Sequence, residues 1–97
     1  MKYNFEWHPE KAETNRRKHN VSFEEATTIF KDPDAMSLYD EKNSMLEERW
    51  ITLGFSNNGR ILIVCHTFKE INKDSILIRI FSSRKATKQE MRLWRAK

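Results

Sequence analysis

The sequence predicts an α+β fold: a strand and two helices, then an antiparallel meander of three to four strands, then a C-terminal helix. Three observations support this order. Short segments alternate apolar and polar residues, which is the period of half-buried strands. Proline, serine and threonine stand where helices begin. The 97 residues contain two Gly and two Pro, too few for a flexible linker, so we expect a single domain over 1–97.

In the first third of the chain we expect one strand and two helices. Residues 3–7 alternate aromatic and polar side chains and predict a short strand. A proline at the first position supports a helix over residues 9–19, and Asn20 suits a left-handed helix stop. Ser22 opens a capping box at the start of a second helix. Pro33 ends that helix, because proline disfavours the helical conformation of the residue before it.

The rest of the chain carries the predicted meander and the last helix. Strands are expected over residues 36–39, 49–55, 60–68 and 75–82, separated by a polar loop over 40–48, a hairpin turn at Asn57-Asn58-Gly59 and a charged loop over 69–74. The last two strands are apolar on both faces for much of their length. We therefore place them centrally, with the helices packed on one side of the sheet. A second capping box, from Thr87 to Glu90, begins the C-terminal helix.

Basic residues concentrate in the C-terminal part of the chain. Residues 56–97 carry ten Lys or Arg and three acidic residues, a net charge of +7, whereas the whole chain carries +4. A one-sided basic surface on a small domain is typical of proteins that bind a phosphate backbone. The alternative is a solvated helix face with a few charges at strand ends.

Cysteine and histidine usage limits the other classes of function. The lone Cys65 cannot form an internal disulfide, which favours a reducing cytoplasm. No apolar stretch approaches 18 residues, so we expect no membrane span. His8, His19, His66 and Cys65 lack the paired spacing of metal ligands, and we expect no metal site.

Charged residues at the predicted strands suggest chemistry on RNA. These residues are Glu48, Arg49, Arg60, His66, Arg79, Arg84 and Lys85. If the polar faces of neighbouring strands coincide, His66, Arg79 and Arg60 meet on one side of the sheet. Attack by a ribose 2′-OH on its phosphate needs a proton acceptor, cations over the developing charge and a donor to the leaving oxygen. His66 or Glu48 would be the base, and arginines would clamp the phosphate.

Each of these residues also has a plainer interpretation. A lone histidine on a strand is more often a hydrogen-bonded structural residue, and an isolated arginine is more often a solvated surface charge. Most aromatic side chains fit apolar stripes and are expected in the core. Trp50 points away from Ile51 and is the aromatic that we expect to be half exposed, in contact with RNA or a partner.

A set of short motifs runs in order through almost the whole chain. The most specific is Lys18-His19-Asn20-Val21-Ser22-Phe23-Glu24-Glu25-Ala26. The others are Phe5-Glu6-Trp7, Lys11, Asn15, Phe30-Lys31-Asp32-Pro33, Glu48-Arg49, Gly54, Gly59-Arg60, Ile78-Arg79-Ile80, Ser82-Ser83-Arg84-Lys85-Ala86 and Glu90. Together they resemble the BrnT family, small ribonuclease toxins of bacterial type II toxin–antitoxin pairs. Three features depart from the family pattern: His8 in place of Asp, a longer loop over 69–74, and Ser83 in place of a common Ala.

The resemblance implies a RelE-like fold and metal-independent RNA cleavage, without a cofactor, that arrests translation and growth in the cytoplasm. It implies neutralisation by a BrnA-type antitoxin in a 2:2 hetero-oligomer, which contacts operator DNA only through the ribbon-helix-helix dimer of the antitoxin. No membrane is involved. Carried onto this chain, the expected catalytic residues are Arg60, Arg79, Arg84, Glu48 and His66, and the expected RNA-binding residues are Arg49, Lys85, Lys88 and Arg92.

Two other functions fit the same sequence. One is a degenerate toxin, a non-catalytic basic module that binds RNA or a partner without cutting. The other is a structural partner whose basic face binds an acidic or hydrophobic peptide. RNA cleavage that is lost on Arg79→Ala, with the fold retained, would separate a ribonuclease from the degenerate toxin. Antitoxin binding with no RNA affinity at low salt would indicate the structural partner.

Overall fold

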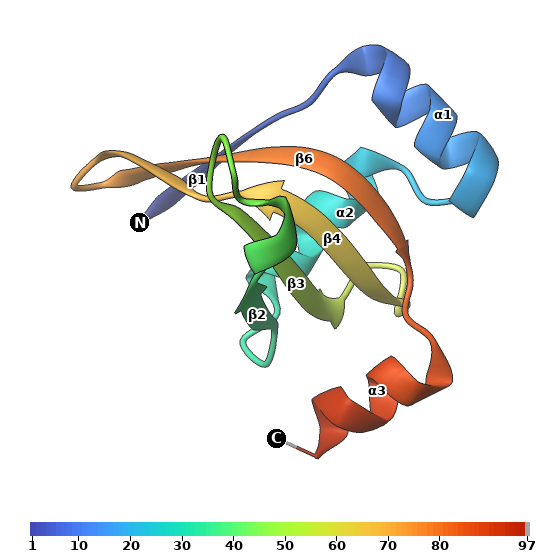
Figure 1. Cartoon of the computed structure of the whole chain (residues 1–97). Helices are drawn as coiled ribbons and strands as arrows, with labels where there is room; N and C mark the ends of the chain where they lie inside the picture. Colours follow the sequence, from blue (N-terminus) through green and yellow to red (C-terminus); the bar gives the residue numbers. More distant parts are fainter. Residues whose placement is uncertain (97) are drawn as a thin grey trace.

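The structure of the chain is a computed structural model and describes residues 1–96. Figure 1 shows the elements in order along the chain. They are β1 (Lys2–Glu6), α1 (Pro9–His19), α2 (Phe23–Thr27), η1 (Thr28–Lys31), β2 (Met36–Tyr39), η2 (Glu41–Asn43), β3 (Arg49–Phe55), β4 (Ile61–Thr67), β5 (Lys69–Asn72), β6 (Ser75–Lys85) and α3 (Lys88–Arg95), where η1 and η2 are short 3₁₀ helices. The predicted α+β class is confirmed.

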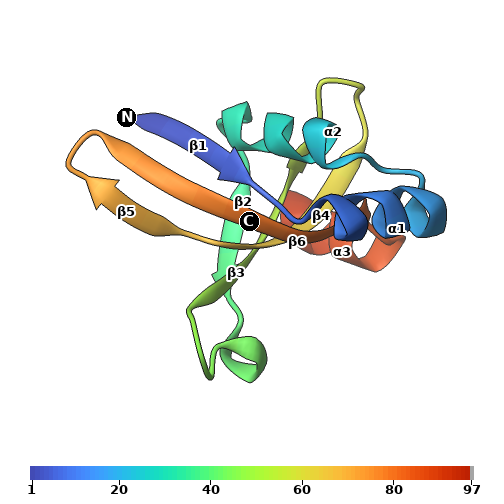
Figure 2. The ribbon, with the colours of Figure 1, turned by 90° about the horizontal axis from the view of Figure 1, so that it is seen from above.

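One long strand, β6, organises the sheet. The strand order is β1-β6-β4-β3-β2, with β5 also paired to β6. All neighbours are antiparallel except β1, which runs parallel to β6. Over its first half β6 lies between β1 and β5 (Figure 2), and over its second half it pairs with β4. The predicted meander is therefore present as β2, β3, β4 and β6.

The prediction of a charged loop over 69–74 was wrong. Lys69–Asn72 forms strand β5, which turns back into β6 and pairs Lys69 with Leu77 and Glu70 with Ile76. Exposed charges on a short edge strand hide the alternation that marks a strand, and such charges are common there because they discourage edge-to-edge association. The pairing is set by the backbone, which the side-chain pattern does not reveal.

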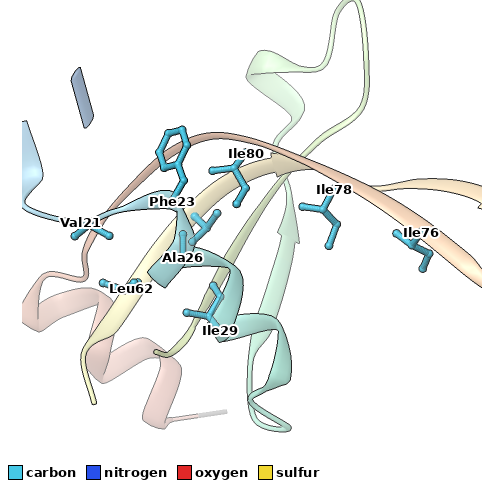
Figure 3. Close-up of a cluster of buried hydrophobic side chains, with 9 residues drawn as sticks. Val21, Phe23, Ala26, Ile29, Leu62, Ile76, Ile78 and Ile80 are labelled. Atoms are coloured by element: carbon cyan, nitrogen blue, oxygen red, sulfur yellow. The ribbon is translucent and has the colours of Figure 1, made fainter. Parts of the chain in front are cut away.

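The main core lies between one face of the sheet and the segment α2–η1. Ile76, Ile78 and Ile80 of β6 are buried against Phe23 and Ala26, as the apolar patterns predicted. Figure 3 shows Ile80, Ile78 and Ile76 spaced along β6, with Phe23 and Ala26 on α2. Burying such side chains is the main stabilising contribution to a domain of this size.

The third helix, α3, covers the other face of the sheet, so the expectation that all helices pack on one side was wrong. Trp94 is buried with Leu53 and Ile63 in a second cluster. The indole of Trp94 packs edge-on against Phe55, with centroids 5.1 Å apart, and its Nε1 donates to the Asp34 carbonyl at 3.0 Å. The reason is in the strands: β4 is apolar on both faces, and β3 adds Ile51 and Leu53 to the second of these faces, which therefore also needs cover.

Helix α1 completes the edge of β6 beyond the end of β1. The Asn15 side chain bonds to both backbone groups of Ser83, accepting from its N–H at 3.1 Å and donating to its carbonyl at 2.7 Å. The helix begins at His8, whose Nδ1 accepts from the Glu10 N–H, and ends at Asn20 with φ 56°. His8 thus serves as the N-cap of α1.

Candidate functional site

The structure separates His66 from Arg79. The sequence left open whether their strand faces coincide, and they do not. His66 pairs with Ile80 on the face of the sheet that α2 and η1 cover. Arg79 is exposed on the other face of β6. His66 is only 1% exposed and packs edge-on against Phe30, with ring centroids 4.9 Å apart.

Both ring nitrogens of His66 have partners. Nδ1 lies 2.8 Å from the Thr67 carbonyl, which can only accept, so Nδ1 carries the proton in the neutral ring. Nε2 then accepts from the Thr52 hydroxyl at 2.6 Å, and Ser37 donates to Thr52 at 2.7 Å. Burial lowers the pKa of His66, although the bond to Thr67 opposes this. The geometry is that of the structural histidine named above as the alternative.

Arg60 ties the β3–β4 hairpin to the start of α2. Its Nε donates to a Glu25 carboxylate oxygen at 2.9 Å, its Nη2 bonds to the other oxygen, and the same Nη2 reaches the Asn20 carbonyl at 3.1 Å. Ser56 also donates to Glu25, at 2.7 Å. Hydrogen bonds from Arg60, aided by Ser56 and opposed by burial, lower the pKa of Glu25. The capping box at Ser22 is therefore only half formed, because Glu25 turns to Arg60 instead.

Arg84 is likewise occupied by a carboxylate. Two bonds of 2.9 Å join its guanidinium to Glu90 of α3, and Glu90 also accepts from the Thr87 N–H, which completes the second predicted capping box. These bonds, above all those from Arg84, lower the pKa of Glu90 to about 2. Along β6, Arg84 is five residues from Arg79, roughly 16 Å of extended strand. Lys85, Lys88 and Arg92 lie at this same C-terminal end.

Arg79 and Glu48 lie at the same hollow of the surface. Both line a hollow of about 350 Å³ that Glu6 and Lys69 also line. The Arg79 Nε donates to Glu6 at 2.7 Å, and the Arg79 N–H donates to the Thr67 hydroxyl at 3.1 Å. The side chains of Arg79 and Glu6, which form an ion pair, are both more than two-fifths exposed. The hollow thus holds a solvent-accessible guanidinium, an amine and carboxylates within one small space.

Phe81 was not singled out from the sequence, but it lines two further hollows beside β6. The β4–β6 register shifts here: Cys65 pairs with Ser82 and His66 with Ile80, so Phe81 between them is a bulged residue. A bulge redirects its side chain. Two cations lie over the Phe81 ring, with Arg49 Cζ at 4.1 Å and Lys11 Nζ at 5.4 Å from its centroid. Contacts of this kind are attractive because the ring face carries negative charge.

Three hollows form one groove beside β6. The first, about 470 Å³, lies between α1 and β6 and shares His8, Lys11 and Phe81 with the second, about 410 Å³. The second shares Glu6 and Arg79 with the hollow of Arg79 and Glu48. We call this continuous surface the β6 groove. Lys11 and Lys18 line it from α1, and their spacing of seven residues, two helical turns, is the sequence signal that would have indicated it.

Other features bear on what the chain can bind. Within residues 1–96, no three His, Cys, Asp or Glu side chains gather closely enough to hold a metal ion. Among the helices of that part of the chain, none is long and apolar enough to cross a membrane. Trp50 is partly exposed, as predicted, but its ring packs edge-on against Tyr39, with centroids 5.3 Å apart.

The fold and the groove together define a small α+β protein of broadly RelE-like organisation, with a charged groove beside its long strand β6. Residues 7–90 match a family model described as "Ribonuclease toxin, BrnT, of type II toxin-antitoxin system", so the chain belongs to the BrnT family. The crystal structure of the Brucella abortus ribonuclease toxin BrnT is similar, with a TM-score of 0.59 and 20% identity over 91% of this chain and 100% of that one. At this identity the likeness is evidence for the fold. Comparison with curated proteins gave no match.

Family membership makes this chain a ribonuclease-toxin homologue from a type II toxin–antitoxin system, for which an antitoxin is the expected partner. Of the residues predicted from the sequence, the structure brings Arg49, Arg79 and Glu48 to the β6 groove. It places Arg60, Arg84 and His66 in separate bonded networks.

Proposed function

We propose that this chain is an endoribonuclease that cuts single-stranded RNA in the β6 groove without a metal ion. The observation that carries the proposal is the exposed Arg79, which shares its hollow with Glu48 and Lys69 at one end of the β6 groove, whose other end is lined by Lys11 and Lys18 together with Glu10. RNA strand cleavage needs a base, a cation and an acid within reach of one phosphate. This hollow offers all three types of group.

In the proposed reaction Glu48 accepts the proton of the ribose 2′-OH as that oxygen attacks the adjacent phosphorus. Arg79 stabilises the negative charge that develops on the phosphorane oxygens. The bond from phosphorus to the 5′-oxygen breaks, and Lys69 donates a proton to the leaving oxygen. The products are a 2′,3′-cyclic phosphate and a 5′-hydroxyl.

The other predicted residues take indirect parts in this proposal. Arg60, Arg84 and His66 act through the fold. Arg60 and Arg84 are each held by two hydrogen bonds to a carboxylate, and His66 is buried, whereas Arg79 makes a single bond to an exposed carboxylate, that of Glu6. Lys85, Lys88 and Arg92 attract RNA over a longer range, an effect that salt screens. Replacing one of these three should weaken RNA binding slightly and reduce its salt dependence.

Purified protein in EDTA is expected to cleave a labelled single-stranded RNA, leaving a cyclic phosphate and a 5′-hydroxyl. The matched control is the same RNA with one 2′-deoxy nucleotide, which should resist cleavage at that position because the attacking hydroxyl is missing. Cleavage that requires an added divalent ion would contradict metal independence. Tight binding without cleavage would instead favour the degenerate, non-catalytic module.

We further propose that cleavage in the cytoplasm arrests translation and growth until a BrnA-type antitoxin forms a 2:2 complex with the toxin. Contact with operator DNA would come only through the ribbon-helix-helix dimer of that antitoxin. The antitoxin is proposed to cover the sheet face that carries α3. Exposed apolar side chains support this location: Leu38 and Leu93 are 56% and 63% exposed, and Phe55 is 43% exposed. Exposed apolar side chains gathered on one face favour a protein partner.

Hydrogen exchange locates this partner surface. In the complex, amides of β2 and α3 are expected to exchange more slowly than in the free toxin, because the antitoxin segment excludes water from them. The amides of η1, on the opposite face, serve as the internal control and should not change. Equal exchange of β2 and α3 in free and bound toxin would contradict the proposed location.

A further inference from the structure

We infer that the α1 end of the β6 groove is a nucleotide subsite, in which Phe81 stacks on a base and Lys11 and Lys18 bind phosphates on one side of the cleavage point. The inference rests on the proposed function for the position of the cut. The ligand that it specifies is an unpaired stretch of RNA lying along the groove.

The charges of α1 divide between two faces. Arg16 and Arg17 both bond to Glu13, at 3.0 and 3.3 Å, so their charges are partly neutralised. Lys11 and Lys18 line the groove, and within residues 1–96 neither makes an ion pair. Cations without a carboxylate partner keep their full attraction for phosphate. Helix α1 therefore presents these two lysines, together with Glu10, to the groove and its paired arginines to solvent.

Phe81 supplies a surface for a base. The bulge in β6 directs its ring to the groove, where it lines both the first and the second hollow. It is partly exposed, unlike the buried isoleucines before it on the strand. Bases stack on aromatic rings and on arginine planes. In the free protein Arg49 and Lys11 lie over the Phe81 ring, so an incoming base displaces one of these side chains to reach the ring. A base can reach such a platform only when it is unpaired, which selects single strands over duplex.

The spacing along the groove fits a strand of RNA that continues past the cut. Phe81 is two residues from Arg79, roughly 7 Å along β6. Lys11 and Lys18 are seven residues apart, roughly 10 Å along α1. The hollow between α1 and β6, about 470 Å³, is within the usual size of small-ligand sites. The scissile phosphate would lie at Arg79, and the neighbouring nucleotides would lie toward Lys18.

The test is binding of a fully 2′-O-methylated single-stranded RNA, which cannot be cut, to five proteins: wild type, Phe81→Leu, Phe81→Tyr, Lys18→Ala and the control Arg17→Ala. Phe81→Leu should weaken binding roughly tenfold because one stacking contact is lost. Phe81→Tyr, which keeps the ring, should restore most of it, and thermal unfolding checks that each variant is folded. Lys18→Ala should reduce the slope of log affinity against log salt by about 0.7, the value for one phosphate contact on a single strand. Arg17→Ala should change the slope less.

A duplex of the same sequence separates stacking from charge. Phe81→Leu should leave duplex binding unchanged, and an equal loss on duplex and single strand would overturn the stacking role. If wild type cuts an unmodified RNA but Phe81→Leu and Lys18→Ala bind like wild type, the subsite is overturned and the cleavage proposal stands. If wild type cuts nothing but the two variants lose affinity, the subsite is supported and the cleavage proposal fails.

Discussion

Replacing Arg79 with alanine is expected to slow RNA cleavage by roughly a hundredfold or more while the protein stays folded. Removing a single preorganised group that stabilises the transition-state charge commonly costs 10²- to 10³-fold in rate. The side chain is 49% exposed and its one ion pair, with Glu6, is on the surface, so little stability depends on it. The measurement is the single-turnover cleavage rate of purified protein, with circular dichroism to confirm the fold.

Arg17→Ala is the matched control for this experiment. Arg17 is also an exposed arginine in an ion pair, but it lies on α1 with Glu13, outside the β6 groove. Its loss should change the rate by no more than a few-fold, through general charge. If Arg79→Ala and Arg17→Ala have equal small effects, RNA is attracted by overall charge and Arg79 is not part of an active site.

Replacing Arg60 with alanine is expected to destabilise the fold by about 2–3 kcal/mol, on the order of 10 °C in melting temperature for a chain of this length. The change leaves Glu25, which is 7% exposed, as a carboxylate without its cation. The cost is below the 3–5 kcal/mol of a fully buried pair because the Arg60 side chain is 27% exposed. Cleavage per folded molecule should stay near that of wild type, since Arg60 lies outside the groove.

The same pair gives a pH signature. The pKa of Glu25 is lowered in the folded protein, so its stabilisation is present above the ordinary value of 4.5 and is lost as the pH falls below it. The free energy of unfolding, measured with denaturant, should therefore fall more between pH 7 and pH 3 for wild type than for Arg60→Ala. Glu25→Gln should reduce this drop in the same way. A stable Arg60→Ala protein that has lost cleavage would contradict this structural role and return Arg60 to the active site.

The elements were predictable from the sequence wherever a local signal defines an end. The bounds of α1 are as predicted because Pro9 starts the helix and Asn20 takes the left-handed conformation that stops it. The hairpin turn at Gly59, with φ 74°, was equally local. Strand β5 was missed although it pairs with the adjacent β6, because its four exposed residues hide the alternation of a strand. The position of α3 depends on distant strands, which supply the apolar surface that it covers.

The groove was harder to predict than the fold because it depends on register. Alternation along a strand tells which residues share a face, but not which faces of two strands coincide. One shifted pair between β4 and β6 puts His66 opposite Ile80 in the core and turns Phe81 outward. Likewise, the basic residues Arg60 and Arg84 looked free in the sequence, but each has a carboxylate partner that only the folded chain reveals.

Expression of this chain alone in bacteria, with wild type beside Arg79→Ala, tests the ribonuclease assignment most directly when growth and RNA integrity are read together. We expect growth arrest with fragmented RNA in cells that make the wild type, and normal growth with intact RNA in cells that make equal amounts of folded Arg79→Ala. Normal growth and intact RNA with abundant, folded wild type would contradict the proposal, and would favour a module that binds RNA or a partner without cutting.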